Sequence, residues 1–288
     1  MSIRVSQSVS LLLLAVPMLV LGEAKVIRDI RYAPELGASG VGSLYLPMQV
    51  KKGTPVVLAI HGGGWSAGDR ASWRGVAEFL QKDLGCAVFN IEYRLASKDG
   101  RWPACGEDCV RAAKWLLAPE FTEVSGLAPV KIWICGGSAG GHLALWTLVN
   151  LPSNKVAGTI SISSVGDPEP DAVMHINRYM ALFGRMPTTA DFAAMDPRLR
   201  IKRGMSPILC THATGDKVVP ISSHRAFADA YLRAGNDCTF FEYPCDVRTN
   251  MTEHCIWRPG SRPHKLIPEI ETQIIRFFRT VRNVELGS

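Results

Sequence analysis

The sequence predicts an α/β fold with a mostly parallel central sheet and helices on both of its faces. Short apolar runs, such as 56–60 and 87–91, alternate along the chain with segments whose apolar residues recur at helical spacing. This alternation is typical of parallel sheets, because each parallel strand needs a crossover before the next one can pair with it. With 288 residues, 47% of them hydrophobic, the chain can bury the large core that such a sheet requires.

Strands are predicted where a short apolar run meets polar or glycine-containing sequence. These runs are 56–60, 87–91, 132–135, 157–165, 208–212 and 239–243. Helices are predicted where apolar residues recur three or four positions apart, which gives the segments 109–117, 142–149, 225–232 and 270–281. In a parallel sheet the reactive loops lie at the C-terminal ends of the strands, so the residues after each strand are the first candidates for a functional site.

One stretch, residues 166–205, interrupts this alternation. It contains prolines, charged residues and short apolar patches such as 179–183, but no clear strand. We expect it to form an inserted cap of short helices over one end of the sheet. The alternative is a long surface excursion that takes no part in the selection of a substrate.

Residues 1–22 have the organisation of a secretory signal peptide. Met1–Ser10 carries one arginine and no acidic residue, and the apolar run LLLLAVPMLVLG follows at 11–22. Pro17 interrupts this run, which is shorter than the ~20 residues of a transmembrane helix, so we expect no stable insertion in a membrane. The sequence therefore predicts a secreted or periplasmic domain over 23–288, with an uncleaved anchor as the alternative.

The charge and the cysteines argue against several classes of function. The net charge of +6 comes from Lys and Arg that are scattered along the chain, so nucleic-acid binding has little support. The eight cysteines include no CxxC pair, which argues against a zinc ribbon or a thioredoxin motif.

Cys245 and Cys255 are close enough in sequence to staple a loop, and Cys105 and Cys109 are one helical turn apart. Cys135 lies in an expected strand, where we expect a small core residue.

Ser138 stands in the glycine-rich stretch KIWICGGSAGGH, between an expected strand and an expected helix. The segment GGSAG at 136–140 fits G-x-S-x-G, in which a sharp turn holds a serine in strained geometry with its oxygen exposed. Gly136 and Gly140 must be small because neighbouring elements pack against them. The turn also places Ser138 at a helix N-terminus, where backbone amides favour a developing negative charge.

A second glycine run, HGGGW at 61–65, directly follows an expected strand. Three glycines allow a loop to approach closely and to aim its N–H groups inward. The tetrahedral intermediate of acyl transfer needs about two or three such donors at its oxyanion. We assign the amides of Gly63 and Gly64, with that of Ala139 directly after the serine, to this oxyanion hole. Trp65 is expected to line the acyl or leaving-group pocket, or else to pack under the loop.

A serine nucleophile needs a base, and the base needs an acid that orients it. Asp216 follows the strand 208–212, while His254 follows the strand 239–243 and precedes the closing helix. Serine, acid and histidine thus occur in the chain order that a nucleophile elbow requires. His264 is the rival base because it also precedes that helix, although a surface position is its ordinary interpretation.

The other polar candidates have ordinary structural interpretations. Asp167 and Asp246 are alternative acids, but neither follows a strand as cleanly as Asp216. His61 is expected to order its own loop, and His142 is expected to be a packed, hydrogen-bonded residue one turn into the helix. No function is assigned to three further histidines, which are His175, His212 and His224.

Together these residues resemble the α/β-hydrolase superfamily, and within it the HGGG-type carboxylesterases. The chain looks most like the small secreted bacterial feruloyl and acetyl-xylan esterases. The resemblance covers the chain from Ala24 to its end and rests on motifs in family order: HGGGW, RWPA with Asp108, GGSAGG, Ser206-Pro207, GDKVVP and a late histidine. The sequence departs from the family at 245–253, a loop that is longer and more polar than usual, and at HATGD, where His-Gly is usual before the acid.

This resemblance implies an α/β-hydrolase fold, a Ser138–His254–Asp216 triad and two-step ester hydrolysis through an acyl-enzyme. It implies small acyl or aryl esters as substrates, on a carbohydrate or another small molecule, and it implies neither a metal nor an organic cofactor. A serine peptidase or amidase on the same fold is the alternative, because ester and amide attack use the same groups. A non-catalytic binding protein with this fold is a third hypothesis.

Overall fold

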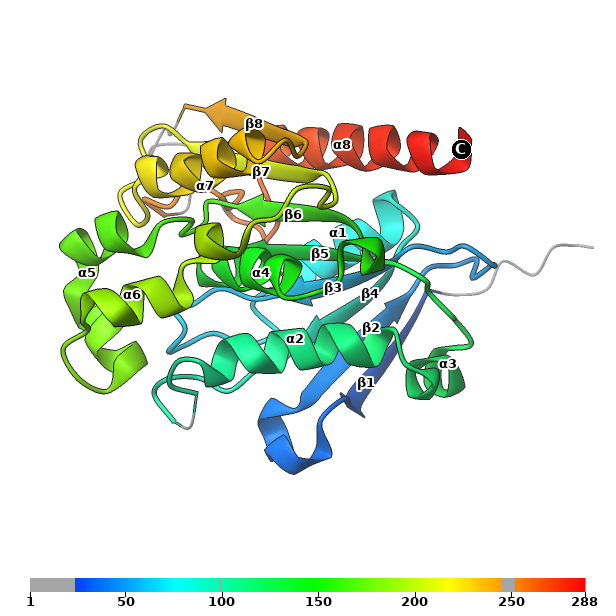
Figure 1. Cartoon of the computed structure of the whole chain (residues 1–288). Helices are drawn as coiled ribbons and strands as arrows, with labels where there is room; N and C mark the ends of the chain where they lie inside the picture. Colours follow the sequence, from blue (N-terminus) through cyan, green and yellow to red (C-terminus); the bar gives the residue numbers. More distant parts are fainter. Residues whose placement is uncertain (1–23, 99, 245–251, 288) are drawn as a thin grey trace, which may run out of the picture.

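An eight-stranded sheet runs through the described part of the chain, which in this computed structural model comprises residues 24–98, 100–244 and 252–287. The strands are β1 (Lys25–Arg31), β2 (Val41–Leu46), β3 (Val56–Ile60), β4 (Ala87–Ile91), β5 (Ile132–Gly137), β6 (Val156–Ile162), β7 (Ile208–Ala213) and β8 (Cys238–Tyr243). Their order in the sheet is β1-β2-β4-β3-β5-β6-β7-β8 (Figure 1). The strands β4, β3 and β5 to β8 pair in parallel, whereas β1 and β2 form an antiparallel edge on β4. The predicted mostly parallel sheet is confirmed.

Helices cover both faces of this sheet. They are α1 (Arg74–Asp83), α2 (Ala104–Leu116), α3 (Pro119–Ser125), α4 (Ala139–Val149), α5 (Pro168–Phe183), α6 (Thr189–Met195), α7 (Ile221–Arg233) and α8 (Pro268–Gly287). Short 3-10 turns are η1 (Pro34–Ser39), η2 (Ser153–Lys155) and η3 (Pro197–Arg200). The helices α2, α4 and α7 pack on one face, and α1 and α8 pack on the other (Figure 1). No helix in the described ranges is long and apolar enough to cross a membrane.

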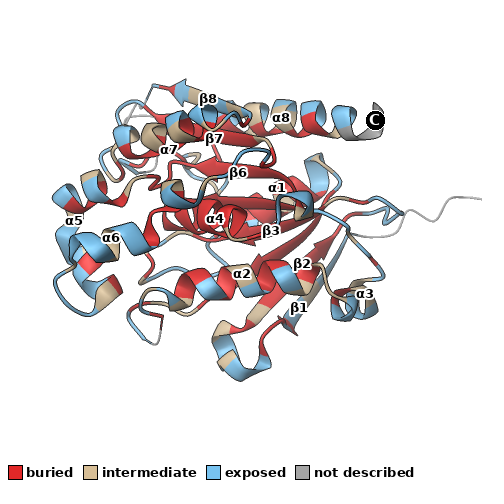
Figure 2. Ribbon diagram, in the orientation of Figure 1, coloured by how far each residue is buried: buried red, intermediate tan, exposed pale blue. Residues whose placement is uncertain are grey.

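The alternation of side chains along β3 shows why a continuous apolar run forms this layer. Val56, Leu58 and Ile60 join the core beneath α2 and α4, whereas Val57 and Ala59 join the core beneath α1 and α8. Successive strand residues point to opposite faces, and here both faces are covered by helices. Every residue of β3 is therefore buried, as the interior of the sheet in Figure 2 shows.

The central helix α4 follows Ser138 and is buried along its whole length. A helix that is apolar on all sides belongs in the interior, and α4 packs on β5 and β6 with α2 beside it on the same face of the sheet (Figure 2). By contrast, α8 buries one side only, through Ile270, Ile274, Phe278 and Val281 at helical spacing. The burial of α4 fixes the position of the turn that carries Ser138.

Several predicted boundaries shift by a few residues. The helix expected at 109–117 begins earlier, at Ala104, and the strand expected at 157–165 ends at Ile162. Ser163 has a φ of 44°, a left-handed conformation that a strand does not accommodate. The predicted signal peptide at 1–22 lies outside the described residues.

Residues 166–205 form helices between β6 and β7, as expected. These helices are α5, α6 and η3, and α5 is longer than the short helices anticipated, with non-helical backbone angles at His175. Asp167 caps α5 by accepting from the Glu169 amide, and a capping box of Thr188 and Asp191 begins α6. Figure 1 shows α5 and α6 at the end of the sheet toward which β8 points. The C-terminal ends of the parallel strands lie at this same end.

Candidate active site

Ser138 occupies a strained turn between β5 and α4. Its backbone angles are φ 57° and ψ −129°, in a region that non-glycine residues rarely adopt, and its amide donates to the Ile162 carbonyl at 2.8 Å. Gly141 and His142 donate their amides to the Ser138 carbonyl and so begin α4. The residues on both sides of Ser138 are buried, but Ser138 itself is partly exposed. This is the geometry that the G-x-S-x-G motif predicts.

The glycines around Ser138 are required by close backbone contacts. A Cβ added at Gly136 would lie 2.1 Å from the Gly140 carbonyl oxygen. One added at Gly140 would lie 2.3 Å from the carbonyl oxygens of both Ile60 and His61, so this glycine lets α4 approach the end of β3. The expectation that Gly136 and Gly140 must be small is confirmed.

The HGGGW loop runs directly beside Ser138. A Cβ added at Gly62 would lie 3.1 Å from the Cβ of Ser138. Gly63 has a φ of 121° and Gly64 a φ of 58°, and the structure records no hydrogen bond from either amide to another described residue. Ala139 is the first residue of α4. The loop thus has the conformation and the position that the predicted oxyanion hole requires, while the assignment of the individual donors stays a prediction.

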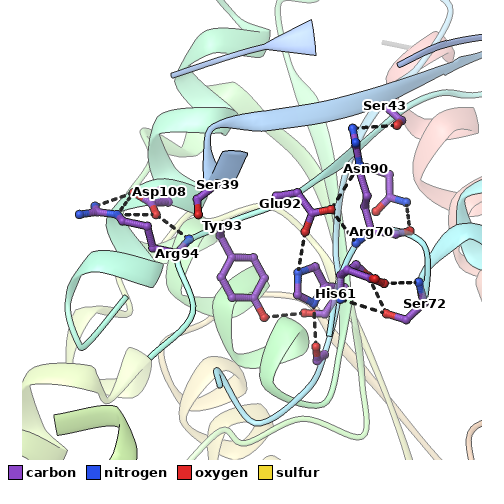
Figure 3. A network of polar contacts seen from close by, with 12 residues as sticks. Ser39, Ser43, His61, Arg70, Ser72, Asn90, Glu92, Tyr93, Arg94 and Asp108 are labelled. Carbon is purple, nitrogen blue, oxygen red and sulfur yellow. Dashed lines mark hydrogen bonds and ion pairs between the residues drawn. The ribbon is translucent and has the colours of Figure 1, made fainter. Parts of the chain in front are cut away.

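His61 holds this loop from below (Figure 3). Its Nδ1 donates to the Gly62 carbonyl at 2.7 Å, and its ring stacks on Tyr93 with a centroid distance of 4.3 Å. The Tyr93 hydroxyl donates to the His61 carbonyl at 3.0 Å, and Glu92 lies 3.7 Å from Nε2 of His61. Burial lowers the pKa of His61 to about 4, so the ring is neutral at pH 7. The prediction that His61 orders its own loop is confirmed.

Asp108, part of the motif shared with the related esterases, has a supporting position. It is fully buried on α2 and accepts two hydrogen bonds from the guanidinium of Arg94, at 2.9 and 2.7 Å (Figure 3). It also accepts from the Arg94 backbone amide at 2.9 Å. This paired contact fixes the segment after β4, next to Tyr93 and the oxyanion loop.

Asp216 and His254 form a short hydrogen bond. Nδ1 of His254 donates to Oδ2 of Asp216 at 2.6 Å, and the other carboxylate oxygen accepts from the amides of Val218 and Val219 at 2.8 and 3.0 Å. Burial raises the pKa of Asp216, but hydrogen bonds from His212 and His254 outweigh this and lower it to about 2. The acid is therefore ionised at neutral pH, as the orienting acid of a serine hydrolase must be.

The other nitrogen of His254 is buried and has no hydrogen-bond partner among the described residues. The structure thus pairs the predicted base with the predicted acid, but it records no hydrogen bond between His254 and Ser138. In free hydrolases such bonds are often long and tighten when substrate binds. The complete triad of Ser138, His254 and Asp216 stays a prediction.

The rival base His264 lies elsewhere. Its Nε2 accepts from Arg262 at 2.7 Å, and its ring packs near Trp257. Asp167, an alternative acid, caps α5 and pairs with Arg198. These contacts give both residues structural positions, and Asp246 lies outside the described residues.

Trp65 is fully buried, which favours the packing alternative over a place in a substrate pocket. Its Nε1 donates to Nδ1 of His142 at 3.3 Å, and its ring packs on Tyr179 of α5. His142 in turn donates from Nε2 to the carbonyl of Met195 at 2.9 Å, and burial lowers its pKa to about 4. His142 is the packed, hydrogen-bonded residue that was expected. Together these contacts tie the oxyanion loop to α5 and α6.

One polar face of α5 was not anticipated from the sequence. Asp171 and Arg178 lie on it about two helical turns apart and form an ion pair at 3.3 Å, while Tyr179 donates to Asp171 at 2.8 Å. A Cβ added at Gly64 would lie 3.4 Å from Cδ and Nε of Arg178, so this side chain covers the oxyanion loop. Burial raises the pKa of Asp171, which also interacts electrostatically with His254. The sequence signal that could have revealed this face is the helical spacing of polar residues in an otherwise apolar segment.

The cysteines are partly accounted for. Cys255 is disulfide-bonded, while Cys245 lies outside the described residues. Cys105, Cys109 and Cys135 are buried free thiols. Within the described ranges, no group of three or more His, Cys, Asp or Glu could hold a metal ion.

Comparisons with known proteins show which chains are similar to this one. Residues 43–164 match the BD-FAE family, and this segment includes the HGGGW loop and Ser138. The arylacetamide deacetylase of Bos taurus is 39% identical over 104 residues, which cover 35% of this chain and 26% of that protein. The acetyl-hydrolase of Streptomyces hygroscopicus is 29% identical over 206 residues, or 65% of each chain.

These matches have a limited extent. The chain spans only about a quarter of the length of the Bos taurus relative. A solved structure, a truncated carbohydrate esterase from gut microbiota, superposes with a TM-score of 0.67 at 21% identity, over 78% of this chain and 89% of that one. At this identity the superposition establishes the fold. The chain therefore has the α/β-hydrolase fold, and its residues 43–164 are similar to the BD-FAE family.

Proposed function

We propose that this chain is a serine carboxylic ester hydrolase that cleaves small acyl or aryl esters, among them esters of carbohydrates. The observation that carries the proposal is the 2.6 Å hydrogen bond from His254 to Asp216, which leaves Nε2 of His254 without a partner among the described residues. A neutral imidazole held in this way has a free basic nitrogen. Ser138 in its strained turn, beside the glycine loop, is the group that such a base would activate.

In the proposed first step, Oγ of Ser138 attacks the ester carbonyl carbon. Nε2 of His254 takes the proton of the hydroxyl and then gives it to the departing alcohol oxygen. Asp216 keeps the Nδ1 proton in place and stabilises the charged imidazole. The amides of Gly63, Gly64 and Ala139 donate to the oxyanion that develops on the carbonyl oxygen.

In the second step, water attacks the acyl-enzyme. His254 takes a proton from the water and returns it to Oγ of Ser138, which releases the carboxylic acid. The same amides stabilise the second oxyanion. This scheme uses neither a metal ion nor an organic cofactor.

Two features support a hydroxyl-rich alcohol as the leaving group. The related proteins include a carbohydrate esterase and an acetyl-hydrolase by name. Arg178 on α5, which pairs with the buried Asp171, brings a guanidinium to the edge of the glycine loop, where it could donate hydrogen bonds to sugar hydroxyls. On this basis residues 166–205 form a cap that selects the substrate. As a separate part of the proposal, the signal-peptide pattern of residues 1–22 directs the protein to the periplasm or out of the cell.

Hydrolysis of p-nitrophenyl acetate by the wild type and by Ser138→Ala tests the proposal. We expect the substitution to lower kcat by at least about 10⁴-fold while leaving the melting temperature within a few degrees. Labelling by a fluorophosphonate probe, lost in Ser138→Ala, separates an enzyme from a non-catalytic binding protein. Equal activity of the two proteins would overturn the assignment of the nucleophile.

Amide hydrolysis is the second candidate, since the Bos taurus relative is named as a deacetylase of arylacetamides. The same serine, histidine and acid would attack an amide, and His254 would protonate the departing amine. Rates on 4-nitroacetanilide and p-nitrophenyl acetate, measured with the same enzyme, decide between the two. A higher kcat/KM on the amide would make this protein an amidase.

A further inference from the structure

A row of buried polar side chains leads away from the same oxygen of Asp216 that accepts from His254. Nε2 of His212 lies 3.4 Å from Oδ2 of Asp216, and Nδ1 of His212 lies 3.1 Å from Nδ1 of His224. Nε2 of His224 then lies 3.1 Å from Oγ of Ser161. The side chains of His212, His224 and Ser161 have no exposed surface, and they come from β7, α7 and β6.

This row is not a second catalytic triad. Ser161 lies within β6, which is paired with β5 and β7 on its two sides, and it is fully buried. No substrate carbonyl can reach it without opening the sheet. His224 contacts His212 rather than a carboxylate, so the row leads to the acid of the proposed site.

The contacts fix the proton on one nitrogen of His212. Its Nε2 faces two groups that can only accept, the Val219 carbonyl at 3.1 Å and the Asp216 carboxylate. This nitrogen must therefore carry hydrogen. When His212 is neutral, its Nδ1 accepts from Nδ1 of His224, and Nε2 of His224 accepts from the hydroxyl of Ser161. In this arrangement Nδ1 of His224 carries hydrogen, so it does not accept from the Ser164 amide, which lies 3.5 Å away. Each donor in the row then points toward Asp216.

Orienting Asp216 requires this second donor. One carboxylate oxygen is held by two backbone amides, and the other accepts from His254 and faces His212. A buried carboxylate that loses one of these donors loses a restraint on rotation about its last side-chain torsion. Its oxygen is also left with an unsatisfied lone pair, which favours a different orientation. Rotation would turn Nδ1 of His254 away from the geometry that presents Nε2 to Ser138.

We propose that His212 is a positioning residue of the esterase site, and that His224 and Ser161 hold its ring so that Nε2 donates to Asp216. His212 touches no substrate and acts through Asp216 and His254. The proposal rests on the function proposed above. According to the proposal, three residues from β6, β7 and α7 help to hold Asp216 in place.

Ser161→Ala tests the proposal with a matched control in Thr159→Val. Both changes remove a buried hydroxyl from the same face of β6, but the Thr159 hydroxyl has no hydrogen-bond partner in the part of the chain that the structure describes. We expect Ser161→Ala to lower kcat on p-nitrophenyl acetate about 10-fold with KM unchanged within twofold, well short of the ~10⁴-fold effect of losing a triad acid. Thr159→Val should retain the wild-type kcat.

His212 is tested by a conservative pair. His212→Gln keeps an N–H near the position of Nε2, whereas His212→Leu removes it. We expect the glutamine variant to recover most of the activity that the leucine variant loses. Equal losses in both, or a kcat for Ser161→Ala equal to that of Thr159→Val, would overturn the proposal.

Proton NMR gives a readout that does not depend on activity. The hydrogen shared by His254 and Asp216 should resonate far downfield in the wild type and in Thr159→Val, and it should shift upfield or broaden in Ser161→Ala and His212→Leu. An unchanged resonance in both of these variants would contradict the positioning role. If the wild type hydrolysed no ester and took no fluorophosphonate label, the proposed function would fail, and this resonance would still decide whether the row positions Asp216.

Discussion

At the scale of single residues, the site depends on backbone contacts that allow no side chain. Gly140 brings the first turn of α4 against the carbonyl oxygens of Ile60 and His61, at the end of the strand that carries the oxyanion loop. This approach is what sets Ser138 beside Gly62. Each glycine is needed where an added Cβ would come too close to a neighbouring backbone oxygen. The position of each glycine therefore matters more than the number of glycines in the motif.

Gly140→Ala should prevent stable folding. The added Cβ would lie 2.3 Å from two backbone oxygens, and neither can move without displacing β3 or α4, so we expect a loss of more than about 3 kcal/mol in the free energy of unfolding. Gly126→Ala is the control, because its Cβ would meet open space and only the positive φ of 72° costs energy, about 1 kcal/mol. Urea unfolding measures both. Similar losses for the two variants would show that the close contact with the backbone oxygens is not what requires glycine at position 140.

Two buried histidines should make the fold sensitive to acid. Burial lowers the pKa of His61 and of His142 from 6.5 to about 4, so the unfolded chain binds more protons than the folded one between these values. The free energy of unfolding should therefore fall as the pH is lowered from about 6.5, by about 2 kcal/mol per histidine at pH 5.

Urea titrations at pH 7.5 and pH 5 measure this fall. His142→Gln keeps a donor for the Met195 carbonyl but does not titrate, so its stability should change less between the two pH values than that of the wild type. A variant with the same pH dependence as the wild type would show that His142 does not contribute.

At the scale of elements, α5 is the part of the insert that reaches the site. Its polar face brings Arg178 over Gly64 and Asp171 into electrostatic contact with His254, while its outer face exposes Val173 and Met174. The buried side of α5 also carries the apolar residues Tyr179 and Leu182, which anchor the helix. The charged pair on the same helix, beside the glycine loop, supports a role in binding.

Arg178→Ala should therefore change substrate preference more than catalysis. We expect a rise in KM of about 5- to 10-fold for an acetylated xylo-oligosaccharide, with a change of less than twofold for p-nitrophenyl acetate, which has no sugar hydroxyls. Steady-state kinetics on the two substrates measure this, with Arg185→Ala as a control on the exposed end of the insert. Equal effects on both substrates would place Arg178 in general support of the loop.

The elements that the sequence did not predict have weak local patterns. β1 reads KVIRDIR and buries only Ile30, because it is an edge strand whose other side chains are largely exposed. β2 interrupts its apolar residues with Gly42 and Ser43, and α1 is amphipathic but short. The central strands were predictable because both of their faces are buried and most of their residues are apolar.

At the scale of the whole molecule, each motif of the proposed site comes after a different parallel strand of the sheet. The oxyanion loop follows β3, Ser138 follows β5, Asp216 follows β7 and His254 comes after β8, so each lies at the C-terminal end of the parallel sheet. This is why spacing alone could nominate the serine, the acid and the base.

The rest of the site comes from contacts between elements that are distant in sequence. His212, His224 and Ser161 meet only because β6, β7 and α7 are neighbours, and no local pattern marks their association. The same holds for Arg178 of α5, which reaches a loop more than a hundred residues earlier in the chain. For Trp65, its place next to the glycine loop in the sequence suggested a pocket residue, but its side chain is buried against α5 of the insert.

The central claim is that Ser138 is the nucleophile activated by His254. Peptide mapping by mass spectrometry after reaction with a fluorophosphonate tests it most directly. We predict one adduct, on the peptide that contains Ser138, and labelling at least about 100-fold slower in His254→Ala, since the base that deprotonates the serine is then absent. An adduct on another serine, or undiminished labelling of Ser138 in His254→Ala, would contradict this account.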